Sequence, residues 1–122
     1  MPPGTLVRLT EITIDCRDPR RVAEFWCALL GAPGTNVPMP GWYRIDPLNE
    51  GGPMINFQPV PEEKQGKART HLDLETDDIE RAILTVQELG GRDLGERHDY
   101  PEGTVRVMAD PEDNEFCLVQ HY

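Results

Sequence analysis

The sequence predicts an α+β fold in which two βαβββ modules form a curved sheet, or cup, with the helices on its outer face. A near-repeat supports this prediction, because residues 10–31 and 70–91 align without a gap, with Thr10 on Thr70 and Gly31 on Gly91. In both copies a stretch that alternates apolar and polar residues is followed by a stretch of helical periodicity. Each unit exposes an apolar face, so the two units must pack together.

Both copies begin with a predicted strand. Apolar and polar residues alternate strictly over residues 11–15 and 71–75, which is the pattern of a strand with one face on a core. We expect the first of these strands to cover residues 6–15. The apolar residues predicted to face the core are Ile12, Ile14, Leu72 and Leu74, and the polar residues predicted to face the cup are Glu11, Thr13, His71 and Asp73.

A helix is predicted after each of these strands. Asp18 and Pro19 supply an N-cap and a first-turn proline for a helix over residues 19–30, which Gly31 ends. Asp78 caps the second helix, and the glycines at residues 90–91 end it. The apolar residues expected to pack these helices on the outer face of the sheet are Phe25, Trp26, Leu29, Ile83 and Val86.

The rest of module one, which is expected over about residues 6–60, carries weaker signals. Residues 32–41 contain three prolines and two glycines, so they form either a loop or a very short edge strand. Strands are predicted at residues 42–46 and 54–58. Residues 59–68 are charged and lack core residues, which indicates a linker between the modules.

Module two is expected over about residues 68–120 and repeats the order of module one. Strands are predicted at residues 92–96, 104–108 and 115–120, with a loop at residues 98–103 and a turn between the last two strands. The two modules account for nearly all of residues 1–122, which we therefore predict to be a single domain.

Composition limits the classes of partner. The chain of 122 residues has 12 Lys and Arg against 22 Asp and Glu, which gives a net charge of −10. Because nucleic acid and anionic membranes bind to basic patches, this charge argues against both as partners. A neutral or cationic small molecule is the better ligand, unless the acidic residues serve only solubility. No apolar run approaches the ~20 residues of a membrane span, and we expect a cytoplasmic protein with three reduced cysteines.

Three motifs resemble the vicinal oxygen chelate superfamily, which includes glyoxalases, extradiol dioxygenases and bleomycin-resistance proteins. They are Asp18-Pro19 followed by residues 23–31, the run from His71 to Leu74, and residues 110–117, in which Asp113 stands where the superfamily has a turn glycine. The resemblance covers about residues 6–120 and implies a glyoxalase-like domain. Fold and activity are only loosely coupled, so the resemblance bears more on the fold than on the function.

The resemblance also implies where metal ligands would lie. The four places in this chain are Glu11, Asn56 or Gln58, His71 and Cys117. An amide is a weak ligand, and a thiolate is soft where a hard carboxylate is usual for magnesium, manganese or ferrous ion. The cofactor therefore remains open, and no metal is expected. If a divalent metal binds, the expected ligands are Glu11, His71 and Cys117, which suit zinc or nickel.

Two functions are consistent with these residues. In the first, Glu11 and His71 are catalytic and transfer a proton next to a polarised oxygen, as in a lyase or isomerase of glyoxalase type. In the second, the cup only binds a small molecule, as in drug-sequestering relatives. In both, the residues expected to contact the ligand are Asn56, Gln58, Asp73, Cys117 and Trp42.

The repeat makes a geometric prediction and leaves simpler roles open. Glu11 and His71 occupy matched places, so a pseudo-twofold axis would bring them together across the cup as an ion pair. His71 could instead bond only to Asp73, and Cys117 could be a small buried hydrophobic residue. Since modules of this size leave sheet edges that a partner can cover, we also expect a symmetric homodimer.

Overall fold

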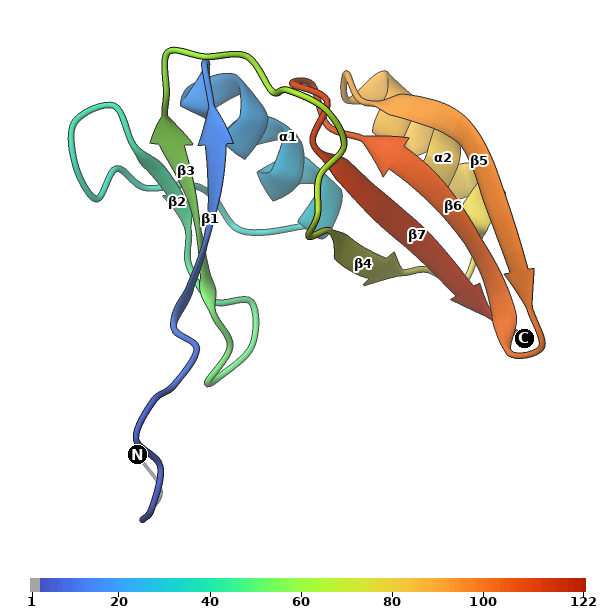
Figure 1. Ribbon diagram of the computed structural model, residues 1–122, viewed down its shortest axis with the longest axis horizontal. Coiled ribbons are helices and arrows are strands. Elements are labelled where there is room, and N and C mark those ends of the chain that lie inside the picture. Colours follow the sequence, from blue (N-terminus) through green and yellow to red (C-terminus); the bar gives the residue numbers. More distant parts are fainter. Residues whose placement is uncertain (1–2) are drawn as a thin grey trace.

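The computed structural model describes residues 3–122 and confirms the two βαβββ modules (Figure 1). Module one contains β1 (Glu11–Cys16), α1 (Pro19–Leu30), β2 (Tyr43–Ile45) and β3 (Met54–Pro59). An isolated bridge between Asn36 and Arg44 stands in for the short edge strand. Module two contains β4 (Leu72–Glu75), α2 (Ile79–Glu88), β5 (Arg92–Tyr100), β6 (Gly103–Ala109) and β7 (Glu115–His121).

The strands form two sheets with the same internal order. Module one has the order β1-β3-β2 and module two the order β4-β7-β6-β5. The first strand of each module runs parallel to the last strand of that module, and the other neighbours are antiparallel. Helix α1 packs on the first sheet and α2 on the second, so each sheet keeps one face free of helices.

Both helices are capped by aspartates, as the sequence predicts. The side chain of Asp18 accepts a hydrogen bond from the backbone N–H of Arg21, and that of Asp78 from the N–H of Arg81. Gly31 ends α1 with a φ of 66°, a left-handed conformation that glycine adopts without strain. The buried residues of the two helices are Pro19, Val22, Ala23, Phe25, Trp26, Ile79, Ile83 and Val86.

The predicted strand register is confirmed. Ile14, Leu72 and Leu74 pack against the core, while Glu11 and Asp73 are exposed on the opposite face. A register shifted by one residue would have exchanged the two faces. The polar residues that were expected to line the concave side of the molecule therefore lie on the helix-free faces of the sheets.

A turn in module two fastens α1 to that module. The Phe116 ring lies 4.8 Å from the Trp26 ring, centroid to centroid, and the Trp26 Nε1–H donates to Asp110 Oδ2 at 3.0 Å. The Glu112 carboxylate accepts the backbone N–H groups of Arg17 and Asp18, at 2.6 Å each, beside the start of α1. Helix α1 consequently lies between the two sheets (Figure 1).

Two predicted boundaries are wrong. Strand β1 begins at Glu11 rather than at residue 6, because β3, its neighbour in the sheet, begins only at Met54, which pairs with Glu11. The segment before it extends away from the sheet (Figure 1) and leaves Leu6 92% exposed. Strand β5 continues to Tyr100, where a loop was expected, because a bulge containing Gly95 at φ 75° lets the strand bend and stay paired with β6.

Neither α1 nor α2, the helices of the described residues 3–122, has the length and apolar character needed to cross a membrane.

We predict that Asp110→Asn destabilises the protein without changing side-chain volume. Asp110 is 1% exposed, and each of its oxygens accepts two hydrogen bonds, from the N–H groups of Glu112 and Asn114 and from the side chains of Trp26 and Asn114. An amide NH₂ in place of either oxygen would face two donors, at a cost of about 1–3 kcal/mol. Urea unfolding measures this loss.

The matched control is Asp113→Asn in the same turn. Asp113 is exposed and has a φ of 67°, a conformation that asparagine tolerates. The urea unfolding midpoint of the Asp113→Asn protein should therefore stay near that of the wild type. Equal midpoints for both variants would show that the bonds to Asp110 contribute nothing to stability.

Candidate functional site

The free face of module one carries a closed polar triad of Glu11, Arg44 and Asn56. Arg44 donates from Nε to Asn56 Oδ1 at 2.7 Å and from Nη2 to Glu11 Oε1 at 2.9 Å. Asn56, which is 3% exposed, donates from Nδ2 to the same Glu11 oxygen at 3.2 Å. The Glu11 carboxylate is therefore paired with a cation and an amide through its Oε1 atom.

Sequence reasoning missed Arg44, although a signal was present. Tyr43, Arg44 and Ile45 alternate along β2, and Ile45 is buried in the core. The alternation alone places Arg44 on the free face. The strand order was needed to show that β3 puts Asn56 beside Arg44 and that β1, on the far side of β3, brings Glu11 within reach.

The free face of module two carries a different cluster, made by His71, Asp73 and Cys117. Asp73 on β4 lies opposite Cys117 on β7, and His71 Nε2 lies 3.3 Å from Asp73 Oδ1. One nitrogen, one oxygen and one sulfur atom of these residues lie within 4.8 Å of one another. Burial and then the nearby Asp73 carboxylate raise the pKa of the Cys117 thiol to about 11, so the free thiol is protonated at neutral pH.

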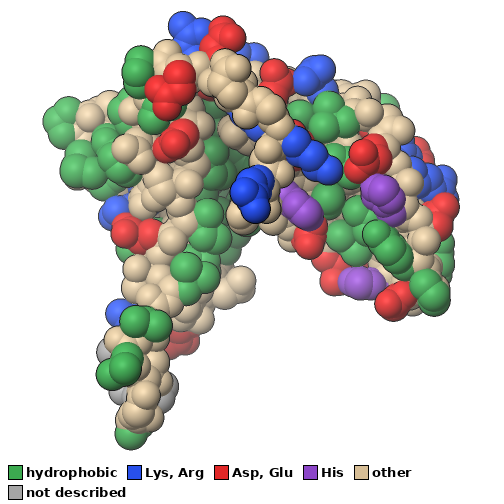
Figure 2. Space-filling view, viewed as in Figure 1, with side chains coloured by type: hydrophobic (Ala, Val, Ile, Leu, Met, Phe, Trp, Pro, Cys, Tyr) green, Lys and Arg blue, Asp and Glu red, His purple; other side chains and the backbone are tan. Residues whose placement is uncertain are grey.

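A pocket of about 400 Å³ surrounds this cluster. Its apolar part is formed by Val105, Val107 and Val119 on β6 and β7, and the rings of His98 and Tyr100 stack beside it with centroids 6.4 Å apart. Figure 2 shows apolar side chains gathered between the histidines on this side of the molecule. The other lining residues are Lys67, Ala68, His71, Asp73, Glu96, Glu115 and Cys117.

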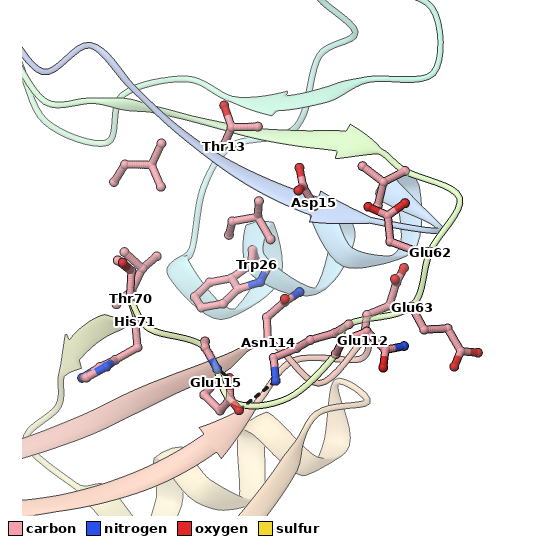
Figure 3. Close-up of a pocket in the computed structure, with 17 residues that line it drawn as sticks. Thr13, Asp15, Trp26, Glu62, Glu63, Thr70, His71, Glu112, Asn114 and Glu115 are labelled. Carbon is pink, nitrogen blue, oxygen red and sulfur yellow. Dashed lines mark hydrogen bonds and ion pairs between the residues drawn. The ribbon is translucent and has the colours of Figure 1, made fainter.

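A second pocket, of about 440 Å³, lies between the modules (Figure 3). Ile12, Ile14, Leu72 and Trp26 form its apolar wall, and the acidic residues around them are Asp15, Glu62, Glu63, Glu112 and Glu115. Ala68, His71 and Glu115 line both pockets, so the two hollows meet at His71.

The segment between β3 and β4 is held over the second pocket by Glu115. Lys64 Nζ donates to Glu115 Oε1 at 2.9 Å, the contact drawn as a dashed line in Figure 3, and the backbone N–H of Ala68 donates to Oε2 at 3.0 Å. Burial alone would raise the pKa of Glu115, but these two donors outweigh it and lower the pKa. Glu115 therefore positions the linker relative to both pockets.

The expected approach of Glu11 to His71 is not found. Among residues 3–122, no hydrogen bond or ion pair joins them: Glu11 bonds to Arg44 and Asn56, and His71 contacts Asp73. The strands β1 and β4 meet across the pocket between the modules through Ile12, Ile14 and Leu72, and Glu11 is not among the residues that line this pocket.

The other residues expected to contact a ligand also lie in different parts of the molecule. Asp73 and Cys117 join His71 in the pocket of module two. Asn56 is closed off by its bonds to Arg44 and Glu11 on module one. Gln58 and Trp42 are half-buried and line neither of the two pockets described above.

The four places implied for a metal do not fit one ion within this chain. Glu11 and Asn56 bond to each other and to the Arg44 guanidinium, whose positive charge opposes a bound cation at those atoms. His71 and Cys117 lie in the separate cluster of module two. A metal site built from all four therefore requires a different arrangement of the modules from the one observed.

Comparisons with known proteins agree on the fold. The sequence profile of the glyoxalase-like domain matches residues 11–119. A glyoxalase, bleomycin resistance protein and dioxygenase family enzyme from Burkholderia phytofirmans is similar with a TM-score of 0.76 at 16% identity, over 95% of this chain and 100% of that one. No curated protein sequence matches the chain.

Two further similar structures differ in what they do. TnmS3, an antibiotic-binding protein from a Streptomyces species, has a TM-score of 0.67 at 21% identity and covers 96% of this chain and 98% of its own. The oxidase ChaP-H1 has a TM-score of 0.67 at 15% identity and covers 95% and 97%. Similarity at this level of identity shows the shared fold and leaves the activity to the residues of the site.

We predict that Glu115→Gln destabilises the protein by about 1 kcal/mol at neutral pH, because the ion pair with Lys64 is lost. The folded-state pKa of Glu115 is lowered, so its contribution is present above the unfolded-state pKa of roughly 4.3 and is lost as the pH falls through the folded value. Thermal unfolding from pH 7 to pH 3 should show the two proteins converging. A constant difference across this range would contradict the assigned charge interaction.

Proposed function

The chain belongs to the glyoxalase-like domain family, and we propose that it binds a neutral or cationic small molecule with an apolar body on the free face of module two. One observation carries this proposal: the 400 Å³ pocket there combines a wall of three valines with His71, Asp73 and Cys117 at its polar end. Ligand sites of proteins typically join an apolar lining to a few polar groups in this way.

The charges around the pocket support the choice of ligand. Asp73, Glu96 and Glu115 line it, and the chain as a whole carries a net charge of −10. Glu115 is paired with Lys64 and Glu96 contacts His98, so Asp73 contributes most to the negative charge inside the pocket. An anionic ligand would meet repulsion from these carboxylates, whereas a cationic group would be attracted. The rings of His98 and Tyr100 offer a flat surface for a planar part of the ligand.

The structural neighbours are consistent with binding. TnmS3 is an antibiotic-binding protein of the same fold, which supports a binding role for this chain. The module-one triad also favours binding over the expected two-residue catalysis, because Glu11 is committed to Arg44 and is not in contact with His71.

A second candidate function is proton transfer by His71 alone. Its Nε2 contact with Asp73, at 3.3 Å, is the kind of carboxylate–imidazole contact that orients a general base. Mass spectrometry of each bound compound after incubation distinguishes the two roles, since a binding protein returns the compound unchanged.

We predict that compounds found by a thermal-shift screen lose affinity in His71→Ala and Val107→Asp. His71→Ala removes a polar contact worth on the order of 2 kcal/mol if the contact is charged, and Val107→Asp places a carboxylate in the apolar wall. Gln87→Ala, on the exposed side of α2, is the matched control and should bind as the wild type does.

Glu11→Gln extends this test to module one. A site confined to module two predicts unchanged affinity in this variant. A compound that binds equally well to the wild type, His71→Ala and Val107→Asp would place the binding site elsewhere on the protein.

We also propose that the protein is a homodimer in which a second copy covers the segment before β1. Leu6, Val7 and Leu9 are 92%, 82% and 69% exposed, which is unusual for three apolar residues so close together. We predict a dimer in sedimentation velocity at roughly tens of micromolar and a monomer for the double variant Leu6→Asp and Leu9→Asp, because burying two carboxylates at an interface is costly. A wild-type protein that sediments only as a monomer would contradict the dimer.

A further inference from the structure

The pocket between the modules holds an alkylammonium group that belongs to the chain itself. The Lys64 and Glu115 side chains line this pocket and are 19% and 15% exposed, and their ion pair joins Nζ to Oε1 at 2.9 Å. Lys64 Nζ also donates to the carbonyl oxygen of Gly66. We propose that this pocket is a second site, which binds an organic ammonium compound in the place that Lys64 occupies at Glu115. It is separate from the site proposed on the free face of module two.

The pocket has room for the apolar body of such a compound. Ile12 and Ile14 on β1 and Leu72 on β4 are half-buried and line it. Its volume of about 440 Å³ falls within the usual range of small-molecule sites. A ligand that covers these side chains removes their carbon atoms from water, which favours binding roughly in proportion to the apolar area covered.

The charges around the pocket favour a cation over an anion. Glu63 is paired with the Arg17 side chain at 2.8 Å, and Glu112 accepts two backbone N–H groups beside the start of α1. Figure 3 shows Asp15 and Glu62 at the same end of the pocket, and no ion pair within residues 3–122 neutralises either of them. The pocket therefore stays negatively charged with its one lining lysine in place, so it attracts a cation.

An ammonium compound can replace Lys64 without detaching the linker. Glu115 accepts from Lys64 through Oε1 and from the backbone N–H of Ala68 through Oε2, so an exchange at Oε1 leaves the second bond intact. One ammonium group replaces another, which keeps the charge at Glu115 balanced. Residues 60–71 form neither helix nor strand, so Lys64 can turn to solvent without breaking a sheet. Lys64 is therefore an internal competitor of the ligand.

Binding of hexylammonium to the wild type and to Lys64→Met tests this site. Methionine keeps an unbranched apolar side chain but lacks the ammonium group, so it leaves Glu115 without its cation. Calorimetric titration should show that Lys64→Met binds hexylammonium at least about tenfold more tightly than the wild type, because Lys64 occupies the site in most wild-type molecules. The gain should disappear in the double variant Lys64→Met and Glu115→Gln. Hexan-1-ol, which has the same apolar body and no charge, should bind equally to the wild type and to Lys64→Met.

Arg20→Met is the matched control, because it removes one positive charge from an exposed ion pair on α1 that lies outside the pocket. It should bind hexylammonium as the wild type does. Lys64→Gln removes the same charge as Lys64→Met and replaces it if methionine disturbs folding. The site would be overturned if Lys64→Met shows no gain, as a purely structural ion pair requires, or shows the same gain for hexan-1-ol. A gain that survives in the double variant, or that appears in Arg20→Met, would also overturn it.

The two sites are tested independently. Val107 lines the pocket of module two and not the pocket between the modules, so adding Val107→Asp to Lys64→Met should leave the affinity for hexylammonium unchanged. A loss of binding in that double variant would assign hexylammonium to module two and overturn the second site. Compounds from the thermal-shift screen that depend on Val107 report on module two alone, so they can bind when hexylammonium fails, and the reverse.

Discussion

The arrangement of the two modules depends on one buried carboxylate. Asp110 accepts four hydrogen bonds, and the one from Trp26 joins groups that are 84 residues apart in the chain. Burial raises the pKa of Asp110, and the bonds from Trp26 and Asn114 act against that rise. Because the same turn accepts the N–H groups beside the start of α1 through Glu112, module two is held against both the side and the end of that helix.

This placement decides what the repeat can do. Helix α1 lies between the sheets, and the helix-free faces of the two modules have different structures. On module one, Arg44 forms hydrogen bonds with Glu11 and Asn56. On module two, the face carries a pocket lined by three valines. Glu11 and His71 occupy matched positions in the repeat but have different neighbours. Glu11 contacts the guanidinium of Arg44 and the amide of Asn56, whereas His71 contacts the carboxylate of Asp73. The chemical difference between the two free faces thus comes from the neighbours of the repeated residues rather than from the repeat itself.

The linker connects this asymmetry to the inter-module pocket. Glu115, the first residue of β7, binds Lys64 and the backbone of Ala68, and it lines both pockets beside His71. The single side chain of Glu115 therefore contributes to the lining of both pockets and also fixes the linker over the pocket between the modules. The carboxylate that holds the linker thus lies beside His71 in both pockets.

Local properties of the sequence determined the elements and their faces. The caps at Asp18 and Asp78 and the alternation around Ile14 and Leu72 depend on neighbours within a few residues, so they could be predicted without a structure. Tertiary structure decided three other features: the residue at which β1 starts, the residue at which β5 ends, and the residues that Glu11 and Asp73 contact. These features depend on which strands pair, and a pairing between distant segments leaves no periodic signal in either segment.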